Sequence, residues 1–566
     1  MKKRIFSVVL ACLLVVGLLT SCGQKTDSNE STKTSTVDGN TNAQDSSSSE
    51  QSTTEVVSVN GNVNLQTYPI SKEKITLTLW YPMGGDMGKL ADFNDAEFFQ
   101  WYEEKTNIHI EFIIPAAGTE VDSFNLLFSS GDMPDMMYTQ PAYHKYRGGE
   151  DKAIDDGFFV DLRDYIDCAP NYMSWVNNNE TLKRAVYSDS GKMYGMWGMW
   201  KPMNGESCMG EAGLAIRQDF LDKVNKEIPT TYDEWYDVLV AFRDELNIEA
   251  PLYTTKYGID TTGELMAGYG TAPYFYNDNG TVKFGPLDDQ YKEYLELLHK
   301  WYQEGLLDKN FPTRNTSSVA PDSDMMLNDK VGACIDWATR LSDTYISRGA
   351  SNPDFWLVAA PQPTKENGPI PKIRKVNGDD LMNDYCMVFS ADSKYIEEAI
   401  RWTDGFYAED IYLNANYGLE NQEGVVWLKA EDGHRIGNYD FRYKNPDGMD
   451  SATVLVKYWV KNPPLRVEAA QIEQADENKQ SAYKIWSQYE ASWWMPSRIT
   501  MTSDEATTFS SIYTDIETYV NESVVKFITG AQSLDTYDSF RNTLKEMGIE
   551  QAIALKQAAL DRYYNR

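Results

Sequence analysis

Apolar and polar residues alternate twice early in the folded part of the chain, with the period of two that is typical of a half-buried strand. Ile75, Leu77 and Leu79 alternate with threonines, and a second alternation covers residues 108–114. A stretch of helical character at 93–105 lies between them, and another at 121–129 leads to a third short apolar run at 136–138. Strand–helix–strand order predicts a parallel sheet, so we expect a doubly wound α/β lobe here.

Later segments have mainly helical spacing. Thr231 with Glu234, and Thr502 with Glu505, form capping-box patterns ahead of apolar residues spaced three and four apart. The run 291–302 repeats that spacing. The sequence Asn-Asp-Asn-Gly at 277–280 separates two apolar runs and predicts an antiparallel hairpin.

The N-terminus has the pattern of an export signal. Three basic residues precede an apolar run at 5–19, which is too short for a comfortable membrane span. The following Leu-Thr-Ser-Cys at 19–22 resembles a bacterial lipobox, which implies removal of residues 1–21 and a lipid on Cys22. An ordinary secretory signal with a chance cysteine is the alternative. Residues 24–64 are rich in Ser, Thr and Asn, and this composition predicts a disordered tether.

Charge and length narrow the class of protein. The 566 residues carry 85 Asp and Glu against 52 Lys and Arg, a net charge of −33. Nucleic acid and direct contact with an anionic bilayer are therefore excluded as expected partners, since both require a basic surface. The length predicts more than one folding unit. The aromatic residues, with 36 Tyr and 15 Trp, favour rings that combine a flat apolar face with a polar atom.

Signals for metal binding and catalysis are weak. No Cys-x-x-Cys occurs, so Cys168, Cys208, Cys334 and Cys386 are expected to be buried free thiols. The four His have no metal-ligand spacing. No cofactor is predicted; a structural calcium ion stays open, although the chain has no EF-hand loop motif. A glycosidase needs only two well-placed carboxylates, so a secreted glycan-acting enzyme also stays open.

Four segments carry a family resemblance. Residues 129–138 (SSGDMPDMMY), 229–244, 277–311 and 527–563 resemble the extracellular solute-binding proteins of bacterial ABC importers, in the family 1 group of LplA-like oligosaccharide-binding lipoproteins. A fifth segment, 417–427, is similar but carries extra residues before Glu423. The resemblance implies a two-lobed periplasmic-binding-protein-like fold of type II, in which each lobe is a mainly parallel sheet flanked by helices and the ligand cleft lies between the lobes.

The resemblance also implies a function and a place in the cell. We expect no enzyme but a monomeric receptor, anchored through the lipid on Cys22 to the extracellular face of the cell membrane, that captures an oligosaccharide and delivers it to ABC permease subunits. A receptor for a peptide or another polar solute, or one that signals, is the remaining alternative. The expected division is a signal at 1–21, a tether at 22–70, lobe 1 at 71–185 plus about 376–480, and lobe 2 at about 186–375 plus about 481–566.

Candidate site residues follow from the chemistry of sugars, which present apolar C–H faces and a rim of hydroxyls. Trp80 ends the first strand and Asp86 lies in the loop after it, where α/β sheets bind ligands. A packed strand end and a solvated turn are the alternatives for these two. Trp197 and Trp200 lie among glycines, a composition that suits either a close-fitting cleft wall or a core.

The family resemblance adds further candidates. Arg217 matches an arginine-containing strand end, where it is either a cleft donor or the partner of Asp219. Asp336 and Trp337 match a strand that ends in a ligand-facing aromatic residue. The candidates from the fifth segment are Tyr417, Glu423 and Trp427.

Overall fold

The computed structural model describes residues 61–566 except for 84–86, 142, 203–209, 256–262, 315–320, 322, 342–344, 347–348, 374–380, 420–427, 430–434, 437–450 and 473–476. Residues 56–566 form one compact unit that contains two larger sheets. Cys22, the tether to residue 60, Asp86, Cys208, Glu423 and Trp427 lie outside the described residues.

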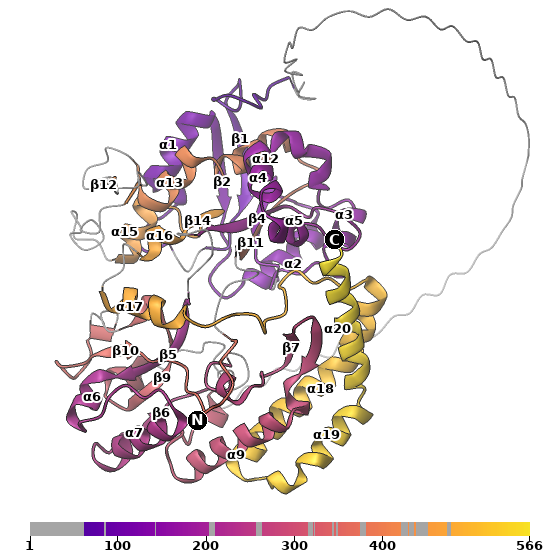
Figure 1. The fold of residues 1–566 in the computed structure, drawn as a ribbon. Helices are drawn as coiled ribbons and strands as arrows, with labels where there is room; N and C mark the ends of the chain where they lie inside the picture. The colour runs from indigo at the N-terminus through magenta and orange to yellow at the C-terminus, as the bar shows by residue number, and fades with distance from the viewer. Residues whose placement is uncertain are drawn as a thin grey trace, which may run out of the picture. The chain divides into compact units, whose positions relative to one another are not determined.

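The first sheet has six strands in the order β14-β4-β11-β3-β1-β2 (Figure 1). Their bounds are Ile75–Trp80 (β1), Ile108–Ile113 (β2), Met136–Thr139 (β3), Met196–Lys201 (β4), Met382–Phe389 (β11) and Leu465–Val467 (β14). β1 pairs in parallel with both β2 and β3, which confirms the predicted βαβ opening. Only β11 runs against its neighbours β3 and β4.

Helices pack against this sheet and share its core. They are Glu97–Thr106 (α1), Glu120–Ser130 (α2), Glu150–Asp155 (α3), Pro170–Asn177 (α4), Glu180–Val186 (α5), Ile396–Gly405 (α12), Glu409–Tyr417 (α13), Ser451–Tyr458 (α15) and Glu468–Ile472 (α16). The predicted helix at 93–105 is divided: a 3-10 turn, Phe93–Asp95 (η2), is capped by Asp92, and extended Ala96 separates it from α1.

The second sheet has the order β10-β5-β9-β6, with bounds Ala212–Arg217 (β5), Ala250–Leu252 (β6), Val331–Trp337 (β9) and Leu357–Ala359 (β10). β5 runs antiparallel to both of its neighbours, and β6 is parallel to β9. The predicted hairpin is confirmed as Phe275–Asp278 (β7) and Thr281–Phe284 (β8), where Asn279 and Gly280 adopt the positive φ angles that a tight hairpin turn requires. A further pair joins Leu428–Lys429 (β12) to Arg435–Ile436 (β13).

Both predicted capping boxes begin helices of the second core. In Figure 1, α9, α18 and α19 lie beside one another. The helices are Gln218–Lys223 (α6), Tyr232–Asp244 (α7), Asp289–Gln303 (α9), Ser323–Leu327 (α10), Glu477–Trp486 (α17), Ser503–Thr529 (α18), Tyr537–Glu546 (α19) and Ile549–Tyr564 (α20). Short 3-10 turns are Leu162–Cys168 (η3), Ala267–Tyr269 (η4), Gly285–Leu287 (η5), Phe311–Thr313 (η6), Ala338–Arg340 (η7) and Leu534–Thr536 (η8).

Strand pairing changes one predicted boundary. β4 pairs with β11 and β14 in the first sheet, so residues 196–201 belong to lobe 1 and the boundary predicted after residue 185 is wrong. Its glycines, which suggested a crossover, instead bring β4 close to β11: a Cβ on Gly198 would lie 2.0 Å from Oδ1 of Asn383. The other predicted boundaries remain predictions. The predicted buried free thiols are confirmed for Cys168, Cys334 and Cys386.

Candidate functional site

Three connections join the two sheets. The chain passes from the carboxyl end of β4 to β5, from that of β10 to β11, and from that of β14 through α16 to α17, which contacts β10. In open α/β sheets, ligands bind outside the carboxyl ends of the strands. We therefore expect the candidate site at the carboxyl ends of the strands.

A row of three tyrosine rings crosses the first sheet at its carboxyl ends, and we call it the tyrosine row: Tyr81, Tyr138 and Tyr385. Tyr81 follows β1, Tyr138 lies on β3 and Tyr385 on β11. The ring centroids of Tyr81 and Tyr138 are 5.7 Å apart, with 22° between the ring planes. Those of Tyr138 and Tyr385 are 5.0 Å apart, with 18° between the planes. The strand register brings the rings together, since β3 is the neighbour of both β1 and β11.

The loop before β14 binds the polar ends of the tyrosine row. The hydroxyl of Tyr81 donates to the carbonyl oxygen of Lys461, and that of Tyr138 donates to the carbonyl oxygen of Asn462, both at 2.8 Å. Asn462 Nδ2 donates to the hydroxyl oxygen of Tyr385 at 3.0 Å. Burial raises the pKa of Tyr138 well above its ordinary value. Tyr138 therefore stays a neutral hydrogen-bond donor at physiological pH.

Arg466 and Trp200 extend the row on the side of β14 and β4. The two residues are paired in the parallel register of these strands. The guanidinium carbon of Arg466 lies 5.2 Å from the ring centroid of Trp200 and 5.3 Å from that of Tyr385. Arg466 is 9% exposed, and its Nε has no hydrogen-bond partner. This cluster, Trp200, Tyr385 and Arg466, combines flat aromatic faces with a cation, and only Trp200 was predicted from the sequence.

At the carboxyl end of β9 the two predicted residues behave differently. Asp336 is completely buried and accepts hydrogen bonds from the Tyr345 hydroxyl at 2.6 Å and from the backbone N–H of Trp337 at 2.8 Å. Arg340 Nε lies 3.5 Å from Oδ1 of Asp336, the same oxygen that accepts the N–H of Trp337. Asp336 thus organises the strand end, and its contact with a ligand stays a prediction. Trp337 is half-buried.

Three other predicted aromatic residues are core residues. Trp80 has no exposed surface; its Nε1 donates to Ser123 Oγ at 3.1 Å, so the alternative of a packed strand end is correct. Trp197 is 3% exposed beneath the guanidinium of Arg498, whose carbon lies 3.7 Å from a ring centroid of the indole. Tyr417 is 2% exposed. The faces of these three rings pack inside the protein, and their contacts with a ligand stay predictions.

Arg217 is the partner of Asp219. Its Nε and one terminal nitrogen donate to the two carboxylate oxygens of Asp219 at 2.7 and 2.8 Å. The same terminal nitrogen donates to Asp329 at 2.6 Å. Arg217 is completely buried, so of the two predicted roles the structure supports the ion pair.

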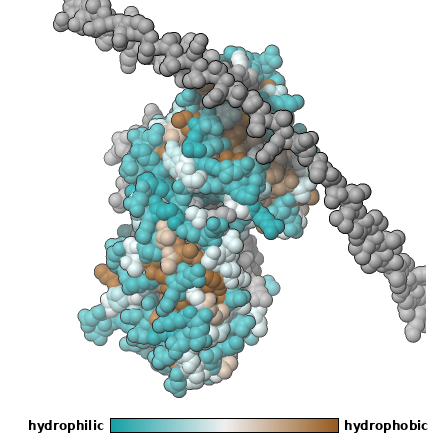
Figure 2. Space-filling model, turned by 90° about the vertical axis from the view of Figure 1, so that its right-hand side faces the viewer, coloured by the Kyte–Doolittle hydropathy of each residue, from teal (hydrophilic) through white to brown (hydrophobic). Residues whose placement is uncertain are grey.

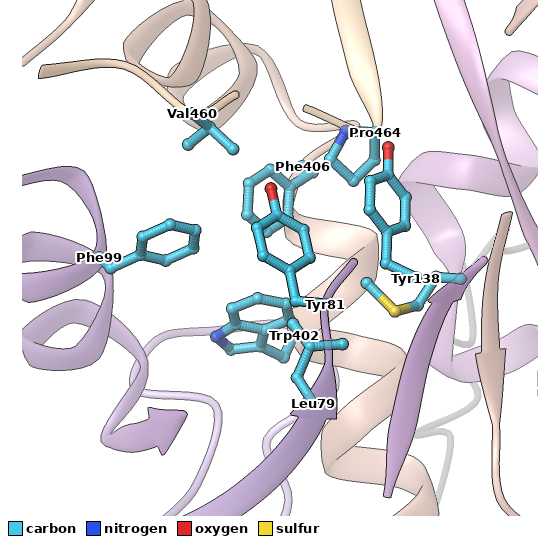
Figure 3. A pocket seen from close by; sticks show the side chains of 9 residues that line it. Leu79, Tyr81, Phe99, Tyr138, Trp402, Phe406, Val460 and Pro464 are labelled. Carbon is cyan, nitrogen blue, oxygen red and sulfur yellow. The ribbon is translucent and has the colours of Figure 1, made fainter. Parts of the chain in front are cut away.

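A small apolar cavity lies beside the tyrosine row (Figure 3). Its volume is about 10 Å³, and the side chains that line it are Leu79, Tyr81, Phe99, Tyr138, Met387, Trp402, Phe406, Val460 and Pro464. A space of this size is at the lower limit for one water molecule. It is a packing void of the core and does not hold a sugar.

Among the residues that the structure describes, no group of three or more His, Cys, Asp or Glu is arranged to hold a metal ion. Within those residues, no helix combines the length and the apolar character needed to cross a membrane. Hydrophilic residues cover much of the face shown in Figure 2.

Comparison with known proteins gives consistent relatives. No protein-family model matches the chain. The fructooligosaccharide ABC transporter substrate-binding protein FusA of Streptococcus pneumoniae is 21% identical over 528 residues, which cover 88% of this chain and 92% of FusA. The polygalacturonan/rhamnogalacturonan-binding protein YtcQ of Bacillus subtilis is 24% identical over 58% of this chain and 63% of its own length. Lipoprotein LipO of the same organism is 26% identical over 39% of this chain and 42% of LipO.

Solved structures agree on the fold. A solute-binding protein from Bifidobacterium longum infantis, associated with an ABC transporter and described as HMO binding, superposes with a TM-score of 0.67 at 17% identity, covering 87% of this chain and 99% of its own. The alginate-binding protein AlgQ2 superposes at 0.64 with 20% identity over 87% and 99% of the two chains. These neighbours share the two-lobed α/β fold that the sequence predicted. In sequence and in fold, the chain is similar to substrate-binding proteins of bacterial ABC transporters.

Proposed function

We propose that this protein captures an oligosaccharide between its two lobes and delivers it to the permease of an ABC importer. The observation that carries the proposal is the alignment with FusA, which extends over 88% of this chain and 92% of FusA, a fructooligosaccharide transporter protein. The second named relative, YtcQ, binds polygalacturonan and rhamnogalacturonan. Both relatives bind carbohydrate, so carbohydrate is the ligand class that we infer.

The composition of the candidate site supports this ligand class. Trp200 and Tyr385 lie at the carboxyl ends of the first sheet, and half-buried Trp337 lies at the carboxyl end of β9 in the second. Aromatic faces pack against the C–H faces of sugars, while polar groups around them bind the hydroxyls. We therefore propose the half-buried rings of Tyr385 and Trp337 as the stacking surfaces, whereas Trp200, at 4% exposed, is buried as Trp197 is. Asp86, Glu423 and Trp427 remain candidates for the rim.

Capture requires a conformational response that both lobes share. A ligand that contacts both sheets favours the closed arrangement by its differential affinity for that state. The segments that absorb the motion are the three connections that follow β4, β10 and β14. The permease then recognises the closed receptor.

Anchoring completes the proposal. The lipobox-like sequence at 19–22 and the tether that follows support a monomer held at the extracellular face of the membrane by a lipid on Cys22. A coil of about 45 residues has an end-to-end distance of roughly 35–40 Å, which keeps the folded body near the permease without contact with the lipid surface. LipO, a relative over part of the chain, is itself named a lipoprotein.

The test is a ligand screen on the soluble chain from Gly23 to the C-terminus. Trp fluorescence and the melting temperature are recorded with a panel of neutral and acidic oligosaccharides, with peptides as the comparison class. We expect at least one oligosaccharide to raise stability by about 2.7 kcal/mol at a hundred times its Kd. The bound sugar should be recovered unchanged, whereas shortened products would indicate an enzyme. Stabilisation by peptides alone, or by nothing in the panel, contradicts the proposal.

A further inference from the structure

We propose that the oligosaccharide bound by this receptor carries a carboxylate, as uronic acid sugars do, and that Arg466 binds that carboxylate. The inference deepens the proposed function and rests on it. The site is the cluster of Trp200, Tyr385 and Arg466, at the edge of the sheet where β4 and β14 end and antiparallel β11 begins.

Arg466 differs from the other buried arginines. Four described arginines are at most 9% exposed. Three of these donate to a carboxylate of the protein: Arg217 to Asp219 at 2.7 Å, Arg401 to Asp404 at 2.9 Å and Arg498 to Glu150 at 2.6 Å. For Arg466, no carboxylate of the described residues lies within ion-pair distance. Its Nε is buried without a hydrogen-bond partner.

A buried guanidinium of this kind needs a partner. It stays charged at any physiological pH, and it carries five N–H donors. Burial of a charge without an opposite charge is strongly unfavourable. The rings of Trp200 and Tyr385, at 5.2 and 5.3 Å, offset part of the positive charge but accept no strong hydrogen bonds. The donors are therefore free for a ligand oxygen.

The geometry of a guanidinium favours a carboxylate over a single hydroxyl. Its planar fork matches the two oxygens of a carboxylate, and the resulting paired hydrogen bonds are charge-assisted. The half-buried ring of Tyr385, whose centroid lies 5.3 Å from the guanidinium carbon, provides a flat face for the sugar ring that bears the carboxylate. Tyr385 is half-buried, so the cluster reaches the surface at that ring.

The charge of the whole chain limits where an acidic sugar can bind. With a net charge of −33, the protein repels anions over most of its surface. An acidic sugar can bind only where a cation is not already neutralised by the protein's own carboxylates. Among the residues that the structure describes, Arg466 meets this condition, and Arg217, Arg401 and Arg498 do not.

The experiment compares matched ligands on the wild-type soluble chain. Isothermal titration calorimetry measures a set of short uronate oligosaccharides, including oligogalacturonides, each against the same oligosaccharide after chemical reduction of its carboxyl groups. We expect one uronate oligosaccharide to bind and its carboxyl-reduced form to bind about 10- to 100-fold more weakly, the factor associated with hydrogen bonds to a charged group. This comparison requires no variant, so it decides the matter even if substitution of Arg466 impairs folding.

Variants then assign the effect to Arg466. Arg466→Gln should weaken binding of the acidic form by the same 10- to 100-fold and leave the carboxyl-reduced form unchanged. Arg466→Lys keeps the charge without the planar fork and should give an intermediate affinity. Arg147→Gln, which removes one positive charge at an exposed position, is the control and should bind as the wild type does.

The outcomes separate the two proposals. Equal affinity of the wild type for a uronate oligosaccharide and its carboxyl-reduced form, or equal affinity of the wild type and Arg466→Gln for the uronate form, overturns the carboxylate inference and leaves the proposed function standing. A preference for a sulfated oligosaccharide over the uronate of the same backbone also overturns it. Binding of no oligosaccharide of any charge overturns the proposed function itself.

Discussion

A single buried histidine should make the stability of the first lobe depend on pH. His144 is 3% exposed, its ring is edge-on to Trp80 at 5.0 Å, and its Nδ1 accepts the backbone N–H of Gln140 at 2.9 Å. Burial lowers its pKa from 6.5 to about 4, while Glu120 acts weakly in the opposite direction. Below pH 6.5 the unfolded chain therefore binds a proton that the folded chain excludes, and stability falls as the pH falls.

The size of the effect follows from the pKa. Each pH unit between the unfolded and folded pKa values is worth about 1.4 kcal/mol, so His144 lowers the free energy of unfolding by about 2 kcal/mol at about pH 5. The loss is complete, at about 3 kcal/mol, below the folded pKa. Above pH 6.5 the contribution is constant.

The assay is urea unfolding, followed by circular dichroism, at several values between about pH 7 and about pH 4.5. His144→Gln keeps an acceptor for Gln140 but cannot take up a proton, so its stability should fall less steeply with pH by the amount given above. Phe124→Leu alters the same ring stack without removing a titrating group. It should shift the whole curve downward and keep the wild-type slope. Equal slopes for wild type and His144→Gln would refute the reasoning.

Three further changes have defined outcomes. Arg498 donates two hydrogen bonds to the carboxylate of Glu150, at 2.6 and 2.7 Å. Glu150→Gln removes the negative charge beside this buried guanidinium and should lower the free energy of unfolding by about 3 kcal/mol. A loss below about 1 kcal/mol in urea unfolding would contradict this. Trp337→Ala should weaken oligosaccharide binding about tenfold by calorimetry, with Trp356→Ala, at an exposed ring, as the unchanged control. Cys22→Ser should move the protein from the membrane fraction to the medium on cell fractionation, and retention in the membrane would argue against the lipid anchor.

Features set by local sequence were predicted correctly. The alternation at 75–80 and 108–113 gives two strands with the expected faces, and Thr231 and Thr502 cap their helices as their partners three residues later indicate. Each of these signals is complete within a few residues. The lobe boundary at 185 failed because strand β4 is defined by its pairing with β11, which lies far away in the sequence.

The site was harder to predict, since residue type indicates what a side chain can bind but not whether it is exposed. Trp80 and Trp197 have the rings that a sugar site needs, yet both are buried. Arg466 gave no local signal: it lies on a three-residue strand, and its neighbours Trp200 and Tyr385 come from strands distant in the sequence. In a chain with 85 acidic and 52 basic residues, a buried arginine has many carboxylates available to it. An arginine that is buried with no carboxylate of the described residues beside it is thus the exception. It can be recognised only after the carboxylates around it have been placed in three dimensions.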